Sequence, residues 1–404
     1  MLHNFHFVSP TEYFFGRGVE RQAASVLKNA GFRRILLHYG QNSVRRSGLL
    51  DQIRADLEAE GLSYWELGGV VPNPRAELAE EAGRLCREQE LDCILALGGG
   101  SALDSAKAAA VFARSEAPSL YAIYSRQFPA EEALPVATVM TFPATGSEAS
   151  DGTVINFMDQ GVKRGYGHDC LRPRFAFLNP ELSYSLPSYQ TYCGVCDMLA
   201  HIMERYFNTQ DEAGLTDAWS LALMRDIIQA ANQVLVAPRD YAARAQLMWA
   251  SPMAHCGLLG VGLEAEDWSC HQLEHELSLH YDVAHGAGLA VIYPNWLDFA
   301  AQGRPAKIAS WARYLFPEQA HGDDAQAAQE GIRAFVRLLH RWGLPLDFKE
   351  LGIPEERIPQ MAQHIRYEED GRRGAYFRMG AAEAQAIYRE AARPWRERWG
   401  LQQD

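Results

Sequence analysis

Residues Cys93–Lys107 read C-I-L-A-L-G-G-G-S-A-L-D-S-A-K, and this stretch decides the fold. The apolar run Cys93–Leu97 has the length of a buried strand, and three glycines follow it. Ser101–Ala113 then has the composition of a helix. A strand, a glycine turn and a helix in this order predict one βαβ unit of a parallel sheet.

The same alternation continues on both sides of that stretch. Arg34–His38 and Leu134–Met140 are predicted strands, and Ser47–Glu60 is a predicted helix. A further strand is expected at Phe175–Leu178. Strands that alternate with helices of this length predict an α/β domain built on a parallel sheet.

The pattern changes near Leu186-Pro187. Long stretches with a period of 3.6 residues follow, such as Leu215–Val236 and Tyr241–Cys256, and strand-like runs nearly disappear. We therefore predict two domains: an α/β dinucleotide-binding domain at residues 1–186 and an all-helical metal and substrate domain at residues 187–404.

Composition excludes several classes of protein. The chain has 404 residues, of which 48% are hydrophobic and 22% charged, so a large core can form. A net charge of -13 argues against nucleic acid and anionic membranes as partners. The N-terminus lacks the features of a signal peptide, and seven irregularly spaced Cys do not form a disulfide framework. We expect a cytoplasmic protein with reduced thiols.

The glycine turn suits a ligand that carries phosphates. Gly98, Gly99 and Gly100 have no Cβ, so anionic oxygens can approach the backbone, and a helix N-terminus favours them. Ser101 is placed to cap the helix or to donate to a phosphate. The alternative is a tight turn in which a glycine adopts a positive φ.

The segment after the strand at Arg34–His38 bears on the choice of cofactor. No Asp or Glu occurs between Ile35 and Gly48, while Ser43 and Arg45 suit a 2′-phosphate. The segment favours NADP(H) over NAD(H). The alternative is that Arg45 and Arg46 only solvate the start of a helix. The hydroxyl-rich loop Thr141–Ser150 is a weaker sign of a ligand site.

Histidines and one aspartate recur at helical spacing in the second half. Asp197 and His201 are separated by four residues, as are His271 and His275, so each pair lies on one helix face. His285 lies directly before Gly286, where we expect a helix to end. Three imidazoles and one carboxylate suit Zn(II) or Fe(II), and the absence of thiolates favours a catalytic site.

Simpler interpretations compete with the metal site. Each histidine taken alone is more often a core or helix-surface residue, and His280 is interpreted as a solvated helix residue. Cys193 and Cys196 form one C-x-x-C without a second pair, so we interpret them as packing thiols.

Several motifs together resemble one family. G-G-G-S-A-L-D-S-A-K, T-F-P-A-T-G-S-E, V-V-P-N-P-R (Val70–Arg75), D-M-L-A-H and H-Q-L-E-H…H-G occur in the order found in the iron-containing (group III) alcohol dehydrogenases. The chain is most similar to the NADPH-dependent butanol dehydrogenase and broad-range aldehyde reductase branch, from about residue 5 to about residue 395.

The resemblance implies a dehydroquinate-synthase-like fold with a cleft between an α/β and a helical domain. It implies Asp197, His201, His271 and His285 as metal ligands, and His275 and Asp104 as the catalytic candidates near the nicotinamide. The cofactor-binding positions that it implies are Gly40, Ser43, Asn73, Gly99, Gly100, Ser101, Asp104, Thr141 and Lys163. Gln41 and Asn42 depart from the glycines that relatives often carry.

The reaction that this implies is reversible hydride transfer between NADP(H) and a primary alcohol or aldehyde, with Fe(II) or Zn(II) as a Lewis acid. No Lys or Arg occurs at residues 197–204 or 267–285, which favours an uncharged substrate. The alternatives are a glycerol or polyol dehydrogenase, another NAD(P)- and metal-dependent member of the superfamily, and a non-catalytic nucleotide- or metal-binding protein. Relatives commonly dimerise, and the β-prone N-terminus is a candidate contact for a homodimer.

Overall fold

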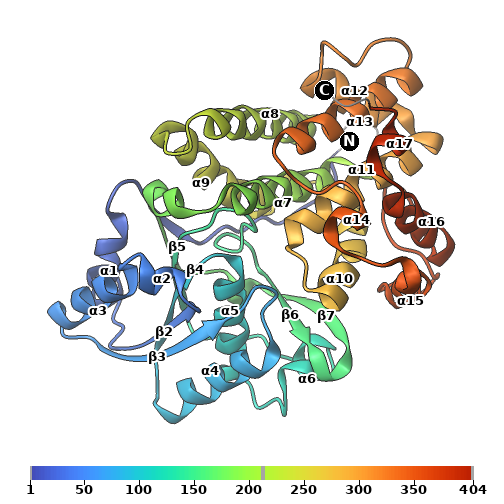
Figure 1. Ribbon diagram of the computed structural model, residues 1–404. Coiled ribbons are helices and arrows are strands. Elements are labelled where there is room, and N and C mark those ends of the chain that lie inside the picture. Colours follow the sequence, from blue (N-terminus) through green and yellow to red (C-terminus); the bar gives the residue numbers. More distant parts are fainter. Residues whose placement is uncertain (1, 211–213, 402–404) are drawn as a thin grey trace. The chain divides into compact units, whose positions relative to one another are not determined.

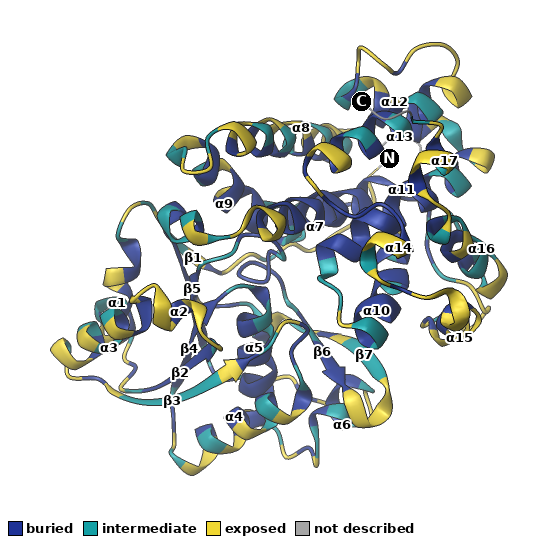
Figure 2. Ribbon diagram, in the orientation of Figure 1, coloured by how far each residue is buried: buried dark blue, intermediate teal, exposed yellow. Residues whose placement is uncertain are grey.

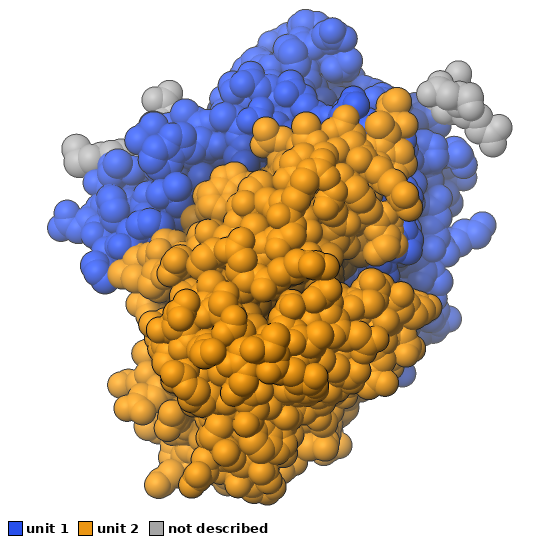
Figure 3. Space-filling view, turned by 90° about the vertical axis from the view of Figure 1, so that its left-hand side faces the viewer, with its two compact units in different colours: residues 1–7, 187–235, 257–404 blue, residues 8–186, 236–256 orange. Residues whose placement is uncertain are grey.

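The chain forms two compact units, each built from segments that are separate in the sequence. The computed structural model describes residues 2–210 and 214–401. One unit comprises residues 8–186 and 236–256, and the other comprises residues 1–7, 187–235 and 257–404 (Figure 3). None of the described helices is long and apolar enough to cross a membrane.

The first unit is built on a six-stranded sheet in which every neighbouring pair of strands is parallel. Its strands, in spatial order, are β1 (Glu12–Phe15), β8 (Phe175–Leu178), β5 (Val136–Met140), β4 (Cys93–Gly98), β2 (Arg34–Gly40) and β3 (Ser63–Val70). The predicted parallel α/β domain is confirmed.

Helices cover both faces of this sheet (Figure 1). Leu37 of β2 packs in one core cluster with side chains of α1 (Ala23–Asn29) and α3 (Leu49–Ala59). The neighbouring Leu36 packs in another cluster with side chains of α4 (Ala76–Glu88) and α5 (Gly100–Arg114). Alternate side chains of a strand point to opposite faces, so a sheet covered on both faces needs continuously apolar strands. All six residues of β4 are accordingly buried (Figure 2).

Short elements surround the cofactor motifs. β6 (Gly152–Phe157) and β7 (Val162–Gly167) form an antiparallel hairpin that the sequence did not predict. Asn156 of β6 bridges Arg75 at the end of V-V-P-N-P-R. The remaining short helices of this unit are α2 (Ser43–Arg46) and α6 (Leu120–Tyr124).

The structure differs from the predicted division into domains at α9 (Tyr241–His255), which belongs to the sheet unit. Met248 of α9 packs in the core beside the sheet, and Ser251 donates its hydroxyl hydrogen to Glu148 Oε1 at 2.9 Å. Periodicity identifies a helix but does not say against which core its apolar face packs. Residues 2–7, although they precede the sheet unit in the sequence, belong to the helical unit.

The second unit contains no strand within residues 187–210 and 214–401. Its helices are α7 (Ser188–Tyr206), α8 (Leu215–Val236), α10 (Ser269–Tyr281), α11 (His285–Gly303), α12 (Pro305–Leu315), α13 (Asp324–Arg341), α14 (Phe348–Leu351), α15 (Ile358–His364), α16 (Ala381–Ala392) and α17 (Trp395–Trp399). α11 packs against α7, α10, α13 and α16, and is therefore the central helix of this unit.

Candidate functional site

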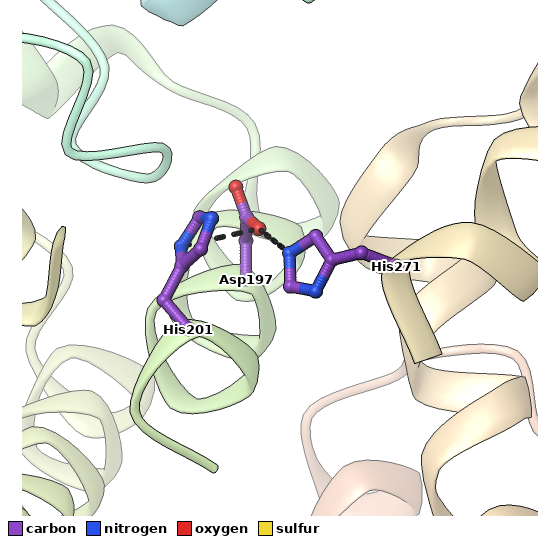
Figure 4. A group of neighbouring side chains, drawn as sticks. All are labelled: Asp197, His201 and His271. Carbon is purple, nitrogen blue, oxygen red and sulfur yellow. Dashed lines mark ion pairs between the residues drawn. The ribbon is translucent and has the colours of Figure 1, made fainter. Parts of the chain in front are cut away.

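Two helices of the second unit bring three candidate metal ligands together (Figure 4). Asp197 and His201 lie one turn apart on α7, and His271 comes from the first turn of α10. Asp197 Oδ1 lies 3.6 Å from His201 Nδ1 and 3.8 Å from His271 Nε2. All three side chains are buried, so the group lies inside the fold rather than on a solvated helix face.

His285 approaches the same carboxylate from the start of a third helix, α11. Its Nε2 lies 3.6 Å from the same Asp197 Oδ1. Ligand atoms about 2.1 Å from a tetrahedral metal lie roughly 3.4 Å apart, so separations of 3.6–3.8 Å suit one shared ion. Each of the three histidines that the sequence singled out therefore approaches the same oxygen of Asp197.

The expected helix end at Gly286 is wrong. His285 is the first residue of α11, and Gly286 lies inside that helix. A Cβ on Gly286 would lie 1.9 Å from the carbonyl oxygen of Cys193, so this glycine allows α11 to approach α7 closely. The preceding helix ends at Tyr281, followed by Asp282 at a positive φ of 51°.

Two buried glutamates, which no sequence motif had indicated, orient two of the histidines. Glu204 Oε1 accepts hydrogen bonds from His271 Nδ1 at 2.8 Å and from the His271 backbone N–H at 2.9 Å. Glu274 accepts from His285 Nδ1. Such contacts fix the ring so that Nε2 faces the metal. The signal was available: Glu204 follows Asp197 by seven residues and so shares its helix face.

The carboxylates also change the proton affinity of the cluster. Burial alone would lower the pKa of His271, but the carboxylates of Asp197 and Glu204 beside the ring outweigh it and raise the pKa to about 9. A group of buried acids that attracts a proton also attracts a divalent cation, which competes with protons for the same nitrogens.

The residues present fit a divalent metal. Asp197 Oδ1 and His271 Nε2 are buried and have no hydrogen-bond partner among the described residues. Unpaired buried polar atoms are costly, and a shared cation would satisfy both. The donor set of one carboxylate and three imidazoles suits Fe(II) or Zn(II).

Two further side chains lie close to these ligands. The ring of His275, one turn after His271, lies 5.8 Å from the ring of His285. Trp268 lies 5.1 Å from the ring of His271 and has a positive φ of 57°. A non-glycine residue in this conformation is strained, and such residues concentrate at functional sites.

In the sheet unit, Gly98 is required by its backbone conformation, and Gly99 and Gly100 are required by close packing. Gly98 has a φ of 150°. A Cβ on Gly99 would lie 2.9 Å from Phe142, and one on Gly100 would lie 2.3 Å from Thr145 Oγ1. The loop at residues 141–150 therefore packs directly on the glycine turn.

The start of α5 differs from the expectation for Ser101. Gly99 is the residue that precedes α5, so Ser101 is not the cap. The N–H of Ala102 already donates to the carbonyl oxygen of Gly99 at 3.1 Å, so Gly100 and Ser101 carry the candidate N–H groups at this helix end. They are the groups that anionic oxygens bind at a helix N-terminus.

Asp104 and Lys107 tie α5 to the neighbouring loop and hairpin. Asp104 accepts hydrogen bonds from Ser147 Oγ at 2.6 Å and from the N–H of Val154 at 2.9 Å. Lys107 Nζ donates to carbonyl oxygens of Ser147, Ser150 and Gly152 at distances of 2.5–3.0 Å. Burial raises the pKa of Asp104 and lowers the pKa of Lys107 to about 8.

The other cofactor candidates also lie in this unit. Lys163 of β7 donates to Asn73 Oδ1 at 3.2 Å, so V-V-P-N-P-R and the hairpin meet there. Thr141 follows β5 and donates its N–H to the carbonyl oxygen of Gly98 at 2.9 Å. Gly40 ends β2, and Ser43 begins α2.

Arg45 belongs to a network beside that segment. Its guanidinium donates to Tyr39 Oη at 2.9 Å, and Tyr39 donates to Glu66 Oε2 at 2.9 Å. Arg54 contacts both Glu66 oxygens at 2.7 Å. Residues 35–48 contain no acid, but Glu66 of β3 brings a carboxylate to this region that the local sequence does not reveal.

Two further histidines and two cysteines lie outside the group of ligands. His255 is in the sheet unit, with Nδ1 2.7 Å from the carbonyl oxygen of Thr145. Cys193 and Cys196 are buried, unbridged thiols of α7, as interpreted. The side chain of His280 is only 11% exposed and lies 3.3 Å from Glu276, so its interpretation as a solvated residue is wrong.

Comparison with known proteins gives one consistent result. The model of the iron-containing alcohol dehydrogenases matches residues 10–180, and that of the C-terminal region of the Fe-containing alcohol dehydrogenase family matches residues 191–392. NADH-dependent butanol dehydrogenase A of Clostridium acetobutylicum is 34% identical over 96% of this chain and 99% of its own length. NADPH-dependent aldehyde reductase YqhD of Escherichia coli is 31% identical over 90% and 93%. The crystal structure of NADH-dependent butanol dehydrogenase A from Thermotoga maritima superposes with a TM-score of 0.92 at 32% identity, covering 97% of this chain and 99% of that one.

Proposed function

The chain belongs to the family of iron-containing alcohol dehydrogenases, and on that premise we propose that it transfers a hydride reversibly between NADP(H) and a primary alcohol or aldehyde. The observation that carries this proposal is the approach of three imidazoles to one buried carboxylate oxygen, at 3.6–3.8 Å.

In this proposal Asp197, His201, His271 and His285 hold Fe(II) or Zn(II). When bound, the metal supplies a Lewis acid for the substrate oxygen and the nicotinamide supplies or accepts the hydride. Glu204 and Glu274 keep two of the rings in the ligating orientation by accepting their Nδ1–H hydrogens.

His275 is the proposed proton relay. It lies one helical turn from His271 and 5.8 Å from the ring of His285, so it is close to the ligands without belonging to the group around Asp197. A neutral imidazole can accept the alcohol proton near pH 7 and pass it to solvent.

The proposed dinucleotide site is the N-terminal end of α5. Gly99, Gly100 and Ser101 would hold the pyrophosphate through backbone N–H groups, with the other cofactor candidates around it. Asp104 is proposed near the nicotinamide, where its hydrogen bonds with Ser147 and Val154 keep the loop and hairpin in place. The other cofactor candidates are Gly40, Ser43, Asn73, Thr141 and Lys163.

We propose a preference for NADPH although curated relatives use either cofactor. NAD-selective sites use an acid that accepts from a ribose hydroxyl, whereas the charge of Glu66 is paired with Arg54, which donates to both of its oxygens. Arg45 keeps a cation beside the Ser43 segment, where a 2′-phosphate would add charge-assisted hydrogen bonds. Comparing kcat/KM for NADPH and NADH in wild type and Arg45→Ala tests this. The proposal requires the ratio to fall, and an unchanged ratio contradicts it.

The substrate is proposed to be uncharged. Arg205 is the nearest cation along α7, but it donates to Glu266 at 3.1 Å and to the carbonyl oxygen of His201 at 2.9 Å. A phosphorylated substrate would need a cation that is not already neutralised. Aldehydes such as butanal suit the site.

A homodimer is also proposed. β1 lies at the edge of the sheet, and the neighbouring Phe15 and Trp249 are 42% and 39% exposed. Edge strands offer unpaired backbone groups to a partner. Light scattering at micromolar concentration should give twice the mass of the chain, and a monomer would contradict the proposal.

The function is tested by oxidation of NADPH with butanal, together with metal content. His271→Ala should lose both metal and turnover, while His275→Ala should keep the metal and lose rate. His321→Ala is the matched control, since this exposed histidine lies in the α12–α13 connection, where its Nε2 is 3.0 Å from the carbonyl oxygen of Glu318. Full activity in a metal-depleted preparation would contradict the proposed role of the metal.

A further inference from the structure

A second group of metal-ligating side chains lies on another part of α10. Glu276, His280 and His364 each offer one ligand atom, and these atoms lie within 4.8 Å of one another. Glu276 and His280 are one turn apart on α10, and His364 ends α15. None of the three belongs to the group around Asp197.

The distances suit a shared ion. Glu276 Oε2 lies 3.3 Å from His280 Nε2 and 3.9 Å from His364 Nδ1. Ligand atoms about 2.1 Å from a tetrahedral metal lie roughly 3.4 Å apart, so a small movement of the exposed His364 ring completes the geometry. That ring is 47% exposed, while the side chains of Glu276 and His280 are 10% and 11% exposed.

The two buried ligand atoms lack hydrogen bonds. Glu276 Oε2 and His280 Nε2 are inaccessible and have no hydrogen-bond partner among the described residues, although they face each other. An ion pair would require a protonated ring, but burial and the neighbouring Arg357 and His364 lower the pKa of His280. Burial raises the pKa of Glu276 to about 7. The observation that supports a ligand here is the geometric one: two buried polar atoms without a hydrogen bond are costly.

We propose that Glu276, His280 and His364 form a second metal site, which binds a divalent transition-metal ion of the Zn²⁺ class with solvent in the remaining position. Two imidazoles and one carboxylate are suitable zinc ligands, and water can occupy the fourth position on the exposed side of His364. Neutral imidazole is the form that a metal requires, and the depressed pKa of His280 favours it.

Arg357 sets the strength of this site. Its guanidinium donates to His280 Nδ1 at 3.4 Å, a long contact at the surface. A ring that ligates through Nε2 carries its hydrogen on Nδ1, which cannot then accept from Arg357. The exposed arginine must therefore turn towards solvent when the ion binds, and its charge opposes binding. Removing it should tighten the site several-fold.

The bound ion would join α15 to α10. α10 also carries His271, so the second site would restrain the helix that supplies a ligand to the first. Binding to the folded chain alone stabilises it by mass action. The second site is therefore inferred to be structural, and its existence does not depend on the proposed function.

The test is equilibrium dialysis of the full chain against Zn²⁺ at pH 7.5, after removal of endogenous metal with a chelator. Wild type should bind two ions per chain. His364→Ala and Glu276→Gln should each reduce the affinity of one ion by tenfold or more, while Arg357→Ala should increase it. His321→Ala, the removal of a comparable exposed histidine, should change neither ion.

His271→Ala separates this proposal from the first site. If both sites exist, this variant loses one ion and the double variant with His364→Ala loses both. A wild type that binds a single ion, lost in His271→Ala and kept in His364→Ala, overturns the second site only. A single ion lost in His364→Ala and kept in His271→Ala supports the second site and contradicts the first. Thermal unfolding provides an independent readout: in the His271→Ala background, Zn²⁺ should raise Tm, and a rise that persists when His364→Ala is added contradicts the proposal.

Discussion

Replacing Glu204 by Gln tests how the protein orients its metal ligands. Glu204 Oε1 accepts from both Nδ1 and the backbone N–H of His271, at 2.8 and 2.9 Å. Glutamine keeps the size of the side chain and one acceptor oxygen but removes the charge that makes the ring more basic. Loss of such a contact reduces metal affinity by about 10–100-fold, or roughly 1.4–2.7 kcal/mol.

The assay is competition with a chromophoric chelator for Fe(II) or Zn(II), read at pH 7.5 for wild type and variant. The matched control is Glu148→Gln, which removes the charge from another buried glutamate, hydrogen-bonded to Ser251 in the sheet unit. Its metal affinity should equal that of wild type. If Glu204→Gln also bound metal as tightly as wild type, the contact with His271 would have only a packing role.

Three further predictions concern stability. Burial lowers the pKa of His38 to about 4 from an ordinary 6.5. Between these values only the unfolded chain gains the proton, so the free energy of unfolding is full above pH 6.5 and falls by about 3 kcal/mol towards pH 4. Urea unfolding of His38→Gln should lack this pH-dependent loss, and a pH profile identical to that of wild type would contradict the prediction. Gly286→Ala should cost about 1–3 kcal/mol, because its Cβ would lie 1.9 Å from the Cys193 oxygen; wild-type Tm would refute this. Lys107→Met should destabilise the sheet unit by about 3 kcal/mol or more, because three carbonyl oxygens of residues 147–152 lose their buried donor. Hydrogen exchange at residues 147–152 should become faster in the variant, and unchanged protection would contradict the prediction.

Strands of the sheet were predictable where the local sequence alone indicates a strand. Cys93–Leu97 is continuously apolar and leads into glycines, and the structure places β4 at Cys93–Gly98. β3 was missed because Ser63–Val70 is an edge strand with two glycines and little alternation. α9 was identified as a helix, but its packing against the sheet depends on contacts such as that of Ser251 with Glu148, which lie 103 residues apart in the sequence.

The candidate ligands were predictable for a different reason. The spacing of Asp197 and His201, and of His271 and His275, is local to one helix, so the sequence shows which side chains share a face. The spacing of residues within one helix does not predict that α7, α10 and α11 come together, because that depends on tertiary packing. Glu204 and Glu274 were missed because an acid near a histidine is common in sequences. Only their burial shows that they act as partners of the rings.

The most direct measurement of the central claim is anomalous diffraction from crystals of the metal-loaded chain, recorded at the absorption edge of the bound metal. We expect an anomalous peak about 2.0–2.2 Å from Asp197 Oδ1, His201, His271 Nε2 and His285 Nε2, with no sulfur ligand. A strong peak elsewhere, with these four side chains bonded only to protein or water, would contradict the proposed metal site.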